Sequence, residues 1–237
     1  MNNVLALDTS SQVLSVALKI GKRDIVESKI VGFLRHAENL LPMIDEILRQ
    51  EKVTIHDLDA FVIGRGPGSF TGLRIGFSTL KGFLALEKKP CFGALSLDMI
   101  AENVRLSENS FLAACLDARR EKIYVRFYRQ KKGRWKPLGK TKVLTINALM
   151  ACLPPASFVA GDALRRYQKE FSCIRGAELL EEGTWYPRAS TLIRWLDEKD
   201  ARITRLTKPR DFLPLYFRFS EAEEKRIVHG HRRRIHI

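Results

Sequence analysis

The chain has 237 residues, 45% of them hydrophobic, and a formal net charge of +14, so it is long enough to bury one large core or the cores of two lobes. It contains no run of about eighteen uninterrupted apolar residues and no basic N-terminal segment with a cleavage site, which argues against membrane and secreted proteins. We therefore expect a soluble, cytoplasmic protein with no membrane partner.

The first predicted elements are three strands in an antiparallel meander. Residues 4–7 form a short apolar strand that ends in Asp8 and three hydroxyl side chains, and residues 13–20 and 25–30 supply two further strands. An amphipathic helix is predicted at 36–48. Because proline costs least in the first turn of a helix, Pro42 indicates a start only a few residues earlier or an irregular start.

A glycine-rich turn at 64–76 follows the apolar run at 58–63, which we predict to be a buried strand. Five glycines and one proline in these thirteen residues indicate a backbone that turns sharply, adopts positive φ, or approaches a neighbour where a Cβ would clash. Helical spacing of apolar residues continues to residue 86. A short strand at 92–95 and a helix at 97–104 complete a first lobe.

The following part of the chain repeats this order. Residues 111–117 end in Asp117 as the first strand ends in Asp8, and residues 157–163 resemble residues 60–66. We interpret this as a duplicated α/β lobe. The predicted ranges are 1–105 for the first lobe, 106–212 for a basic second lobe, and 213–237 for a segment that returns to a lobe and ends in a mobile basic tail. Further helices are predicted at 164–171 and 190–195.

Four segments of the chain resemble the TsaB family, formerly YeaZ. They are LALDTS at 5–10, HAENLLP at 36–42, GPGSFTGLRIG at 66–76 and DAR at 117–119. The resemblance implies an actin/Hsp70/sugar-kinase-like (ASKHA) fold of two RNase H-like lobes, and a role in making N6-threonylcarbamoyladenosine (t6A) at position 37 of tRNA. It further implies a non-catalytic protein that pairs with its paralogue TsaD, the subunit with the transfer chemistry, and is joined by the ATPase TsaE.

No metal site is predicted. A site of the paralogue's kind needs two histidines about one helical turn apart, but the residue four positions after His36 is Leu40. The other histidines are distant, and we interpret His36 as a capping or packing residue. The four cysteines form no C-x-x-C pair, and we interpret all of them as buried reduced thiols: Cys91, Cys115, Cys152 and Cys173.

A nucleotide site in this fold would use the acid at the end of the first strand of each lobe, which here is Asp8 or Asp117. Ser10 stands where kinases of the fold favour glycine, and residues 118–120 put side chains where the second lobe needs room. We interpret Asp8, Ser11 and Asp117 as vestigial candidates for such a site, with Asp8 hydrogen-bonded to its own turn; weak nucleotide binding is the alternative. The protein is thus expected to have no cofactor of its own, and the resemblance implies that ATP and metal are used by partner subunits.

The helices around Pro42 and after the glycine turn form the candidate partner surface. Gly72 and Gly76 lie one turn apart, a spacing that lets a second helix come close. The resemblance implies that this face builds a helical bundle with TsaD, whereas on the alternative both stripes cover the sheet of their own lobe. The partner-binding candidates are His36, Leu40, Leu41, Ile44, Gly72, Leu73, Gly76, Phe77 and Leu80. The same apolar face would support a homodimer in isolation.

The basic surplus lies in the second part of the chain. Residues 1–100 carry 12 Lys and Arg against 11 Asp and Glu, and residues 101–237 carry 29 against 16. Residues 119–142 alone hold 11 Lys and Arg and one acid, interleaved with Tyr124, Phe127, Tyr128 and Trp135. This composition suits tRNA phosphates and unstacked bases. Strand alternation would put some of these aromatic side chains in the core, and a solvated strand face is the alternative.

We therefore expect a non-catalytic scaffold subunit of the t6A machinery that heterodimerises with TsaD. One alternative is an active enzyme of the same fold, either a nucleotide-dependent kinase or a glycoprotease-like metalloprotease. The missing histidine pair opposes the protease, and the occupied glycine positions oppose the kinase. A general RNA-binding protein is the other alternative.

Overall fold

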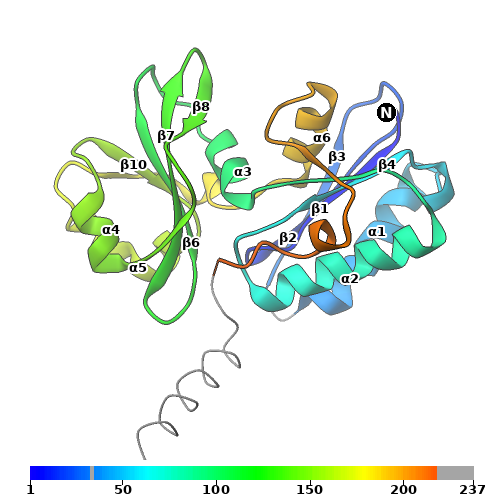
Figure 1. The fold of residues 1–237 in the computed structure, drawn as a ribbon, viewed down its shortest axis with the longest axis horizontal. Coiled ribbons are helices and arrows are strands. Elements are labelled where there is room, and N and C mark those ends of the chain that lie inside the picture. Colours follow the sequence, from blue (N-terminus) through cyan, green and yellow to red (C-terminus); the bar gives the residue numbers. More distant parts are fainter. Residues whose placement is uncertain (33–34, 218–237) are drawn as a thin grey trace, which may run out of the picture.

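A computed structural model of the chain describes residues 1–32 and 35–217. Two six-stranded sheets stand side by side, with helices α3 and α6 between them (Figure 1). The elements of the first half are β1 (Val4–Asp8), β2 (Val13–Lys19), β3 (Val26–Val31), α1 (His36–Gln50), β4 (Ala60–Gly64), α2 (Phe70–Leu86), β5 (Cys91–Ala94) and α3 (Ser96–Glu102).

The second half of the chain builds the second sheet and then returns to the first. Its elements are β6 (Phe111–Asp117), β7 (Lys122–Lys131), β8 (Arg134–Pro137), β9 (Lys142–Thr145), α4 (Ile146–Cys152), β10 (Ser157–Ala160), α5 (Ala163–Ser172), β11 (Glu178–Leu179), α6 (Ala189–Asp197) and β12 (Thr204–Leu206). Short 3-10 helices lie at Ile55–Asp57, Glu182–Thr184 and Pro209–Phe212.

The first strand of the first sheet is buried on both faces. Leu5 and Leu7 lie in a core with α1 and α2, whereas Val4 and Ala6 lie in a second core with α6. Because side chains alternate along a strand, one continuous apolar run serves both layers. Helix α1 begins at His36, so Pro42 lies inside it, a few residues from its start as expected.

The predicted α/β class and the duplication are confirmed. The first sheet has the order β12-β5-β4-β1-β2-β3, and the second has β11-β10-β6-β7-β8 with β9 paired to β7. In both, the first strand pairs antiparallel with the second and parallel with a strand that follows a helix. The two sheets therefore share one strand arrangement, which is that of the two RNase H-like lobes that the resemblance implied.

The chain leaves the second lobe earlier than the predicted boundary at residue 212. Helix α6 packs on β1 and β2, and β12 pairs antiparallel with β5, so residues 189–206 lie with the first sheet. The cause is the apolar face of α6, where Leu192 and Trp195 cover Val4 and Ala6. The other predicted lobe boundaries, at residues 105 and 106, stay a prediction.

The segment after Pro209–Phe212 returns to a lobe, as expected, and that lobe is the first. The Leu215 N–H donates to the carbonyl oxygen of Arg65 at 2.9 Å, and Tyr216 stacks on Phe70 with ring centroids 4.5 Å apart. The remainder of the predicted basic tail, residues 218–237, lies outside the described residues.

Two of the four thiols are exposed, which corrects the prediction that all are buried. Cys91 and Cys115 lie inside the sheets, and burial raises the pKa of Cys91 to about 12. Cys152 and Cys173 end or follow α4 and α5, where they face solvent. Among residues 1–32 and 35–217, no helix combines the length and the apolar character needed to cross a bilayer.

Candidate functional site

Asp8 is fully buried at the end of β1, and its carboxylate is surrounded by groups of its own lobe. Oδ1 accepts hydrogen bonds from the Ser10 backbone N–H at 2.9 Å and the Ser10 hydroxyl at 2.7 Å, and Oδ2 accepts from the Ser96 hydroxyl at 2.8 Å. A Cβ at Gly64 would lie 1.8 Å from Oδ2. The carboxylate therefore bonds to its own turn, as expected, and its surroundings leave no room for a further group on the Gly64 side.

Burial raises the pKa of the Asp8 carboxyl above its ordinary value, while the hydrogen bonds from Ser10 and Ser96 act in the opposite direction. Ser11 is also buried, and its hydroxyl oxygen accepts from the Val13 N–H at 3.1 Å. The His36 ring packs above this turn, with Nδ1 3.0 Å from the Gly32 carbonyl oxygen and Nε2 3.1 Å from that of Ser11. His36 thus ties the start of α1 to the end of β1.

The glycine turn brings α2 directly onto the same segment. A Cβ at Gly72 would lie 2.1 Å from the Thr9 carbonyl oxygen, and one at Gly76 would lie 2.5 Å from the Thr9 hydroxyl. The Ser69 N–H donates to the Ser10 carbonyl oxygen at 2.7 Å, and the Ser69 hydroxyl caps the helix through the Gly72 N–H. The close approach predicted for these glycines exists, but it is made to the turn that follows the chain's own first strand.

The second lobe has a related arrangement at the end of β6. The Asp117 N–H donates to Asp162 Oδ1 at 2.9 Å, and the Arg119 N–H donates to Asp117 Oδ1 at 2.8 Å. Gly161 has φ +122°, and a Cβ there would lie 1.9 Å from the Cys115 carbonyl oxygen. The Arg119 and Arg166 side chains lie 3.4 and 3.8 Å from Asp117 Oδ2, so arginines and packed backbone surround this acid pair.

Replacing Asp162 by Asn should change how stability depends on pH. Burial raises the pKa of Asp162 from 3.8 to about 7, so the folded chain holds this proton more tightly than the unfolded chain between those values. The associated stabilisation is complete below pH 3.8 and is lost as the pH rises through about 7. As the pH rises from 4 to 8, we expect the free energy of unfolding of Asp162→Asn to increase by roughly 3 kcal/mol relative to that of wild type. Urea unfolding across that range measures the difference, and parallel pH profiles would contradict it.

The predicted partner-binding residues lie mostly inside the first lobe. Leu41 is 53% exposed on the outer side of α1. The others are buried in the structure: His36, Leu40, Ile44, Gly72, Leu73, Gly76, Phe77 and Leu80. They seat α1 and α2 on the sheet, as the alternative held, so of this set only Leu41 is open to direct contact with a partner.

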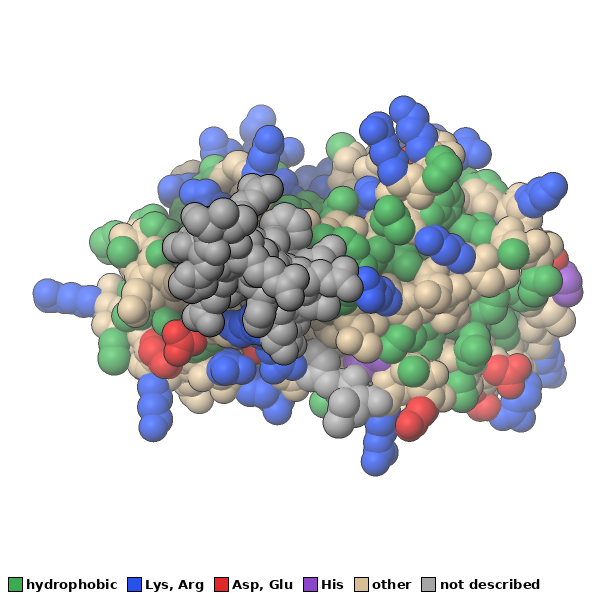
Figure 2. Space-filling view, turned by 60° about the horizontal axis from the view of Figure 1, so that its bottom comes forward, with side chains coloured by type: hydrophobic (Ala, Val, Ile, Leu, Met, Phe, Trp, Pro, Cys, Tyr) green, Lys and Arg blue, Asp and Glu red, His purple; other side chains and the backbone are tan. Residues whose placement is uncertain are grey.

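A groove of about 510 Å³ is lined by residues of α1, α2 and the loop that follows α1, with Leu41 among them. Its floor and walls are Leu41, Ile44, Asp45, Leu48, Arg49, Val53, Thr54, Ile55 and Phe83. Figure 2 brings the lower side of Figure 1 forward and shows hydrophobic side chains spread over this half of the molecule, with Lys and Arg both among them and around them and Asp and Glu at the lower edge. Sequence reasoning missed Val53, Ile55 and Phe83, although the first two are apolar residues next to the end of a predicted helix.

The four aromatic residues of the basic segment are all buried, whereas strand alternation placed only some of them in the core, so they cannot stack on unpaired bases. Trp135 donates from Nε1 to the Val104 carbonyl oxygen at 3.0 Å, and Tyr128 donates to Asp98 at 2.6 Å. Tyr124 and Phe127 pack on opposite faces of β7. The exposed cations of the β7–β8 hairpin remain, grouped as Lys131, Lys132, Arg134 and Lys136.

No cluster of three His, Cys, Asp or Glu side chains with metal-binding geometry occurs among the residues that the structure describes. His229, His231 and His236 lie outside that part of the chain. The predicted lack of a metal site stays a prediction.

Comparison with known families gives a match over more than half of the chain. Residues 33–177 match the TsaD family, described as tRNA N6-adenosine threonylcarbamoyltransferase. Similar proteins include the tRNA threonylcarbamoyladenosine biosynthesis protein TsaB of Haemophilus influenzae, 34% identical over 51% of this chain and 51% of that protein. TsaB of Escherichia coli is 31% identical over 56% and 58%, so these two alignments span just over half of each relative's length. TsaB of Bacillus subtilis is 26% identical over 94% and 96%.

Among solved structures, YeaZ from Pseudomonas aeruginosa is similar in fold. Its TM-score is 0.73 at 28% sequence identity, and the alignment covers 92% of this chain and all of that one. A second structure from the same organism, described as similar to peptidase YEAZ, has the same TM-score at 27% identity. The likeness therefore extends over both lobes.

Proposed function

The chain belongs to the TsaB/YeaZ family of tRNA threonylcarbamoyladenosine biosynthesis proteins, and from this we propose that it is a non-catalytic scaffold subunit of the assembly that makes t6A at position 37 of tRNA. The observation that carries the proposal is the closed environment of Asp8. Its oxygens accept from Ser10 and Ser96, and Gly64 packs against it. An acid engaged in this way holds a turn together and leaves phosphate and metal chemistry to other subunits.

The partner in this proposal is a TsaD-like paralogue, which docks on the outer side of α1 and α2. Leu41 and the adjoining groove offer apolar surface there, flanked by Asp45 and Arg49. An exposed apolar surface with a charged rim is the usual composition of a protein interface. A TsaE-like ATPase joins this pair and, together with TsaD, uses ATP and metal. In the absence of a partner the same surface forms a homodimer.

A contact with tRNA is proposed for the β7–β8 hairpin. Lys131, Lys132, Arg134 and Lys136 gather there beside a cavity of about 610 Å³. Their side chains are exposed, whereas the neighbouring aromatic residues are buried. The contact therefore rests on phosphates, without base stacking.

Co-purification with the TsaD-like protein of the same organism tests the scaffold role. We expect a heterodimer by native mass measurement, t6A formation only when both proteins are present, and no ATP turnover by this chain alone. Leu41→Arg should weaken the pairing by at least about tenfold, because it places a charge on the apolar surface of the proposed contact.

Leu138→Arg is the matched control. Leu138 is also an exposed leucine, at 43%, but it lies in the second lobe away from the groove. Equal pairing of the Leu41 variant and wild type would contradict the docking surface. Transfer of the threonylcarbamoyl group to tRNA by this chain alone would contradict the non-catalytic role.

A further inference from the structure

The strand pairing of the β7–β8 hairpin places four cationic side chains on one face of the second sheet. Arg129 lies directly opposite Lys136, and Lys131 lies directly opposite Arg134. Opposite residues of an antiparallel pair share a face, as do residues two apart along one strand, so all four side chains project from the same side. Trp135, which alternates with them, is buried on the other side against α3.

The same side of the sheet is apolar nearer its middle. Val125 and Phe127 precede Arg129 on this side and pack in a core with α4 and α5, which lie toward the other end of the sheet from the hairpin (Figure 1). Lys142 lies opposite Val125, and its Nζ lies over the Phe127 ring, 5.8 Å from the ring centre. The sheet therefore changes from apolar to cationic where its helical cover ends.

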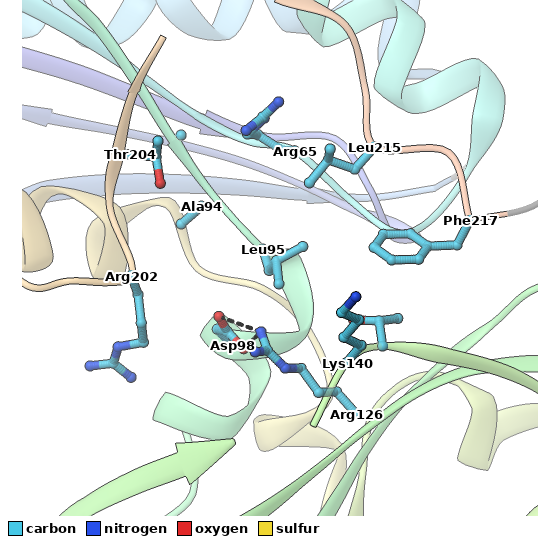
Figure 3. A pocket seen from close by; sticks show the side chains of 12 residues that line it. Arg65, Ala94, Leu95, Asp98, Arg126, Lys140, Arg202, Thr204, Leu215 and Phe217 are labelled. Carbon is cyan, nitrogen blue, oxygen red and sulfur yellow. Dashed lines mark hydrogen bonds and ion pairs between the residues drawn. The ribbon is translucent and has the colours of Figure 1, made fainter. Parts of the chain in front are cut away.

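Lys140 does not belong to this surface, although it lies in the chain between Lys136 and Lys142. It lines a pocket of about 310 Å³ between the two lobes, together with Leu95 of the first lobe (Figure 3). The cationic face of the second sheet is therefore defined by five residues: Arg129, Lys131, Arg134, Lys136 and Lys142.

The register of the cationic face brings like charges together. Like charges directly opposite each other destabilise an antiparallel pair, and this hairpin has two such pairs. Within residues 1–32 and 35–217, Arg129, Lys131 and Lys136 form no ion pair within 4.0 Å. A polyanion laid across the face would offset this repulsion, because its charges would stand between the cations.

Glu108 and Asp200, two acids beside the hairpin, are engaged elsewhere. Both oxygens of Glu108 accept from the backbone N–H of Lys132, at 3.1 and 2.9 Å. Asp200 Oδ2 lies 4.0 Å from Arg134 Nη1 but only 2.8 Å from Arg202 Nη2. The cationic face therefore keeps surplus positive charge.

The aromatic rings beside the cationic face are covered by its own side chains. The guanidinium carbon of Arg129 lies over the Phe111 ring, 5.6 Å from its centre, as Lys142 lies over Phe127. Unstacked bases of a single strand need open rings, and these two rings are covered. A double helix keeps its own bases stacked and presents phosphates on its outside, so it needs cations alone.

We propose that the cationic face binds the sugar–phosphate backbone of a double-helical RNA segment without reading its sequence. The inference rests on the tRNA contact of the proposed function and names the part of tRNA that is bound, a stem and not an unpaired loop. Side chains cannot read the deep, narrow major groove of an RNA helix, so five cations on one open face meet its phosphates.

Fluorescence anisotropy of the full chain with three labelled RNAs tests this binding. The RNAs are a tRNA transcript, a blunt RNA duplex of unrelated sequence, and an unstructured single strand of the same length as the duplex. We expect the duplex to bind within about threefold of tRNA, and the single strand to bind at least about tenfold more weakly than the duplex.

The variant Lys131→Met/Lys136→Met removes one charge from each like-charge pair. We expect it to weaken duplex binding at least about tenfold and to make the slope of log affinity against log salt concentration less steep by about two. Its urea unfolding midpoint should be no lower than that of wild type, because the repulsion across the hairpin is relieved. Lys22→Met/Lys88→Met is the matched control, since both lysines are exposed in the first lobe and the net charge changes equally.

Equal binding of the single strand and the duplex would overturn the proposal, as would absence of duplex binding by the wild-type chain. An equal loss in the Lys22/Lys88 control would also overturn it, because the affinity would then report net charge alone. The outcome is separable from the scaffold role. A chain that pairs with the TsaD-like protein but does not bind the duplex contradicts this inference alone, and a chain that binds the duplex through this face but does not pair contradicts the scaffold alone.

Discussion

Gly72→Ala is expected to destabilise the chain by about 4 kcal/mol, whereas Gly82→Ala in the same helix is expected to stabilise it by roughly 0.5–1 kcal/mol. A Cβ at Gly72 would lie 2.1 Å from the Thr9 carbonyl oxygen, a backbone atom in the turn after β1. Gly82 is exposed on α2, and a Cβ there would meet no atom within 4 Å. The two substitutions are chemically identical, so their difference isolates the seating of α2 on the turn.

Urea unfolding of the two variants beside wild type measures this difference. Helix propensity favours alanine over glycine in the helix interior, so a gain in stability at residue 82 shows that the assay resolves the smaller effect. A Gly72 variant as stable as the Gly82 variant would show that α2 does not rest on the Thr9 carbonyl. Gly76→Ala should fall between them, because the atom it would meet at 2.5 Å belongs to the Thr9 side chain.

Asp8→Ala is expected to destabilise the chain by about 3–4 kcal/mol, and Asp8→Asn by only about 1 kcal/mol. Alanine leaves a cavity and removes the acceptor of the Ser10 N–H, the Ser10 hydroxyl and the Ser96 hydroxyl. Asparagine keeps the shape and one acceptor oxygen. Thermal and urea unfolding measure both changes.

The Asp8→Asn variant also separates scaffold from enzyme. If Asp8 serves only the fold, the variant should support t6A formation with the partner subunits at the wild-type rate. Loss of the reaction with unchanged pairing and unchanged stability would make Asp8 a catalytic residue, which contradicts the proposed function. A structural role alone does not produce that combination.

Most of the fold could be predicted because each helix or strand is indicated by the apolar pattern of its own segment. The predicted elements are present in the structure: a strand at residues 4–7, a helix around Leu40 and a strand at 111–117. The return of α6 and β12 to the first sheet could not be predicted. Leu192 and Trp195 indicate an apolar helix face, but nothing in their spacing says which of two similar lobes they cover.

The candidate site shows a similar limit. The spacing of Gly72 and Gly76 indicated that another segment packs closely on the helix. It did not indicate which segment, because the approaching atoms belong to Thr9, over sixty residues earlier in the chain. Strand alternation indicated that some of the aromatic residues beside the basic ones are buried, but the burial of Tyr124, Tyr128 and Trp135 together also depends on α3, which packs on β6 and β7 in the folded chain. The pocket between the lobes is lined by residues of both, such as Leu95 and Lys140, whose meeting depends on the tertiary fold.

Pairing of β12 with β5 has a consequence for synthesis of the chain. The strand Thr204–Leu206 leaves the ribosome after the whole second lobe, so the edge at Cys91–Ala94 has no partner on that side while residues 95–203 are made. The strands of the second sheet are all available before the first sheet closes. An open strand edge is a template for pairing with another chain. The nascent protein therefore passes through a stage in which its older lobe is the unfinished one.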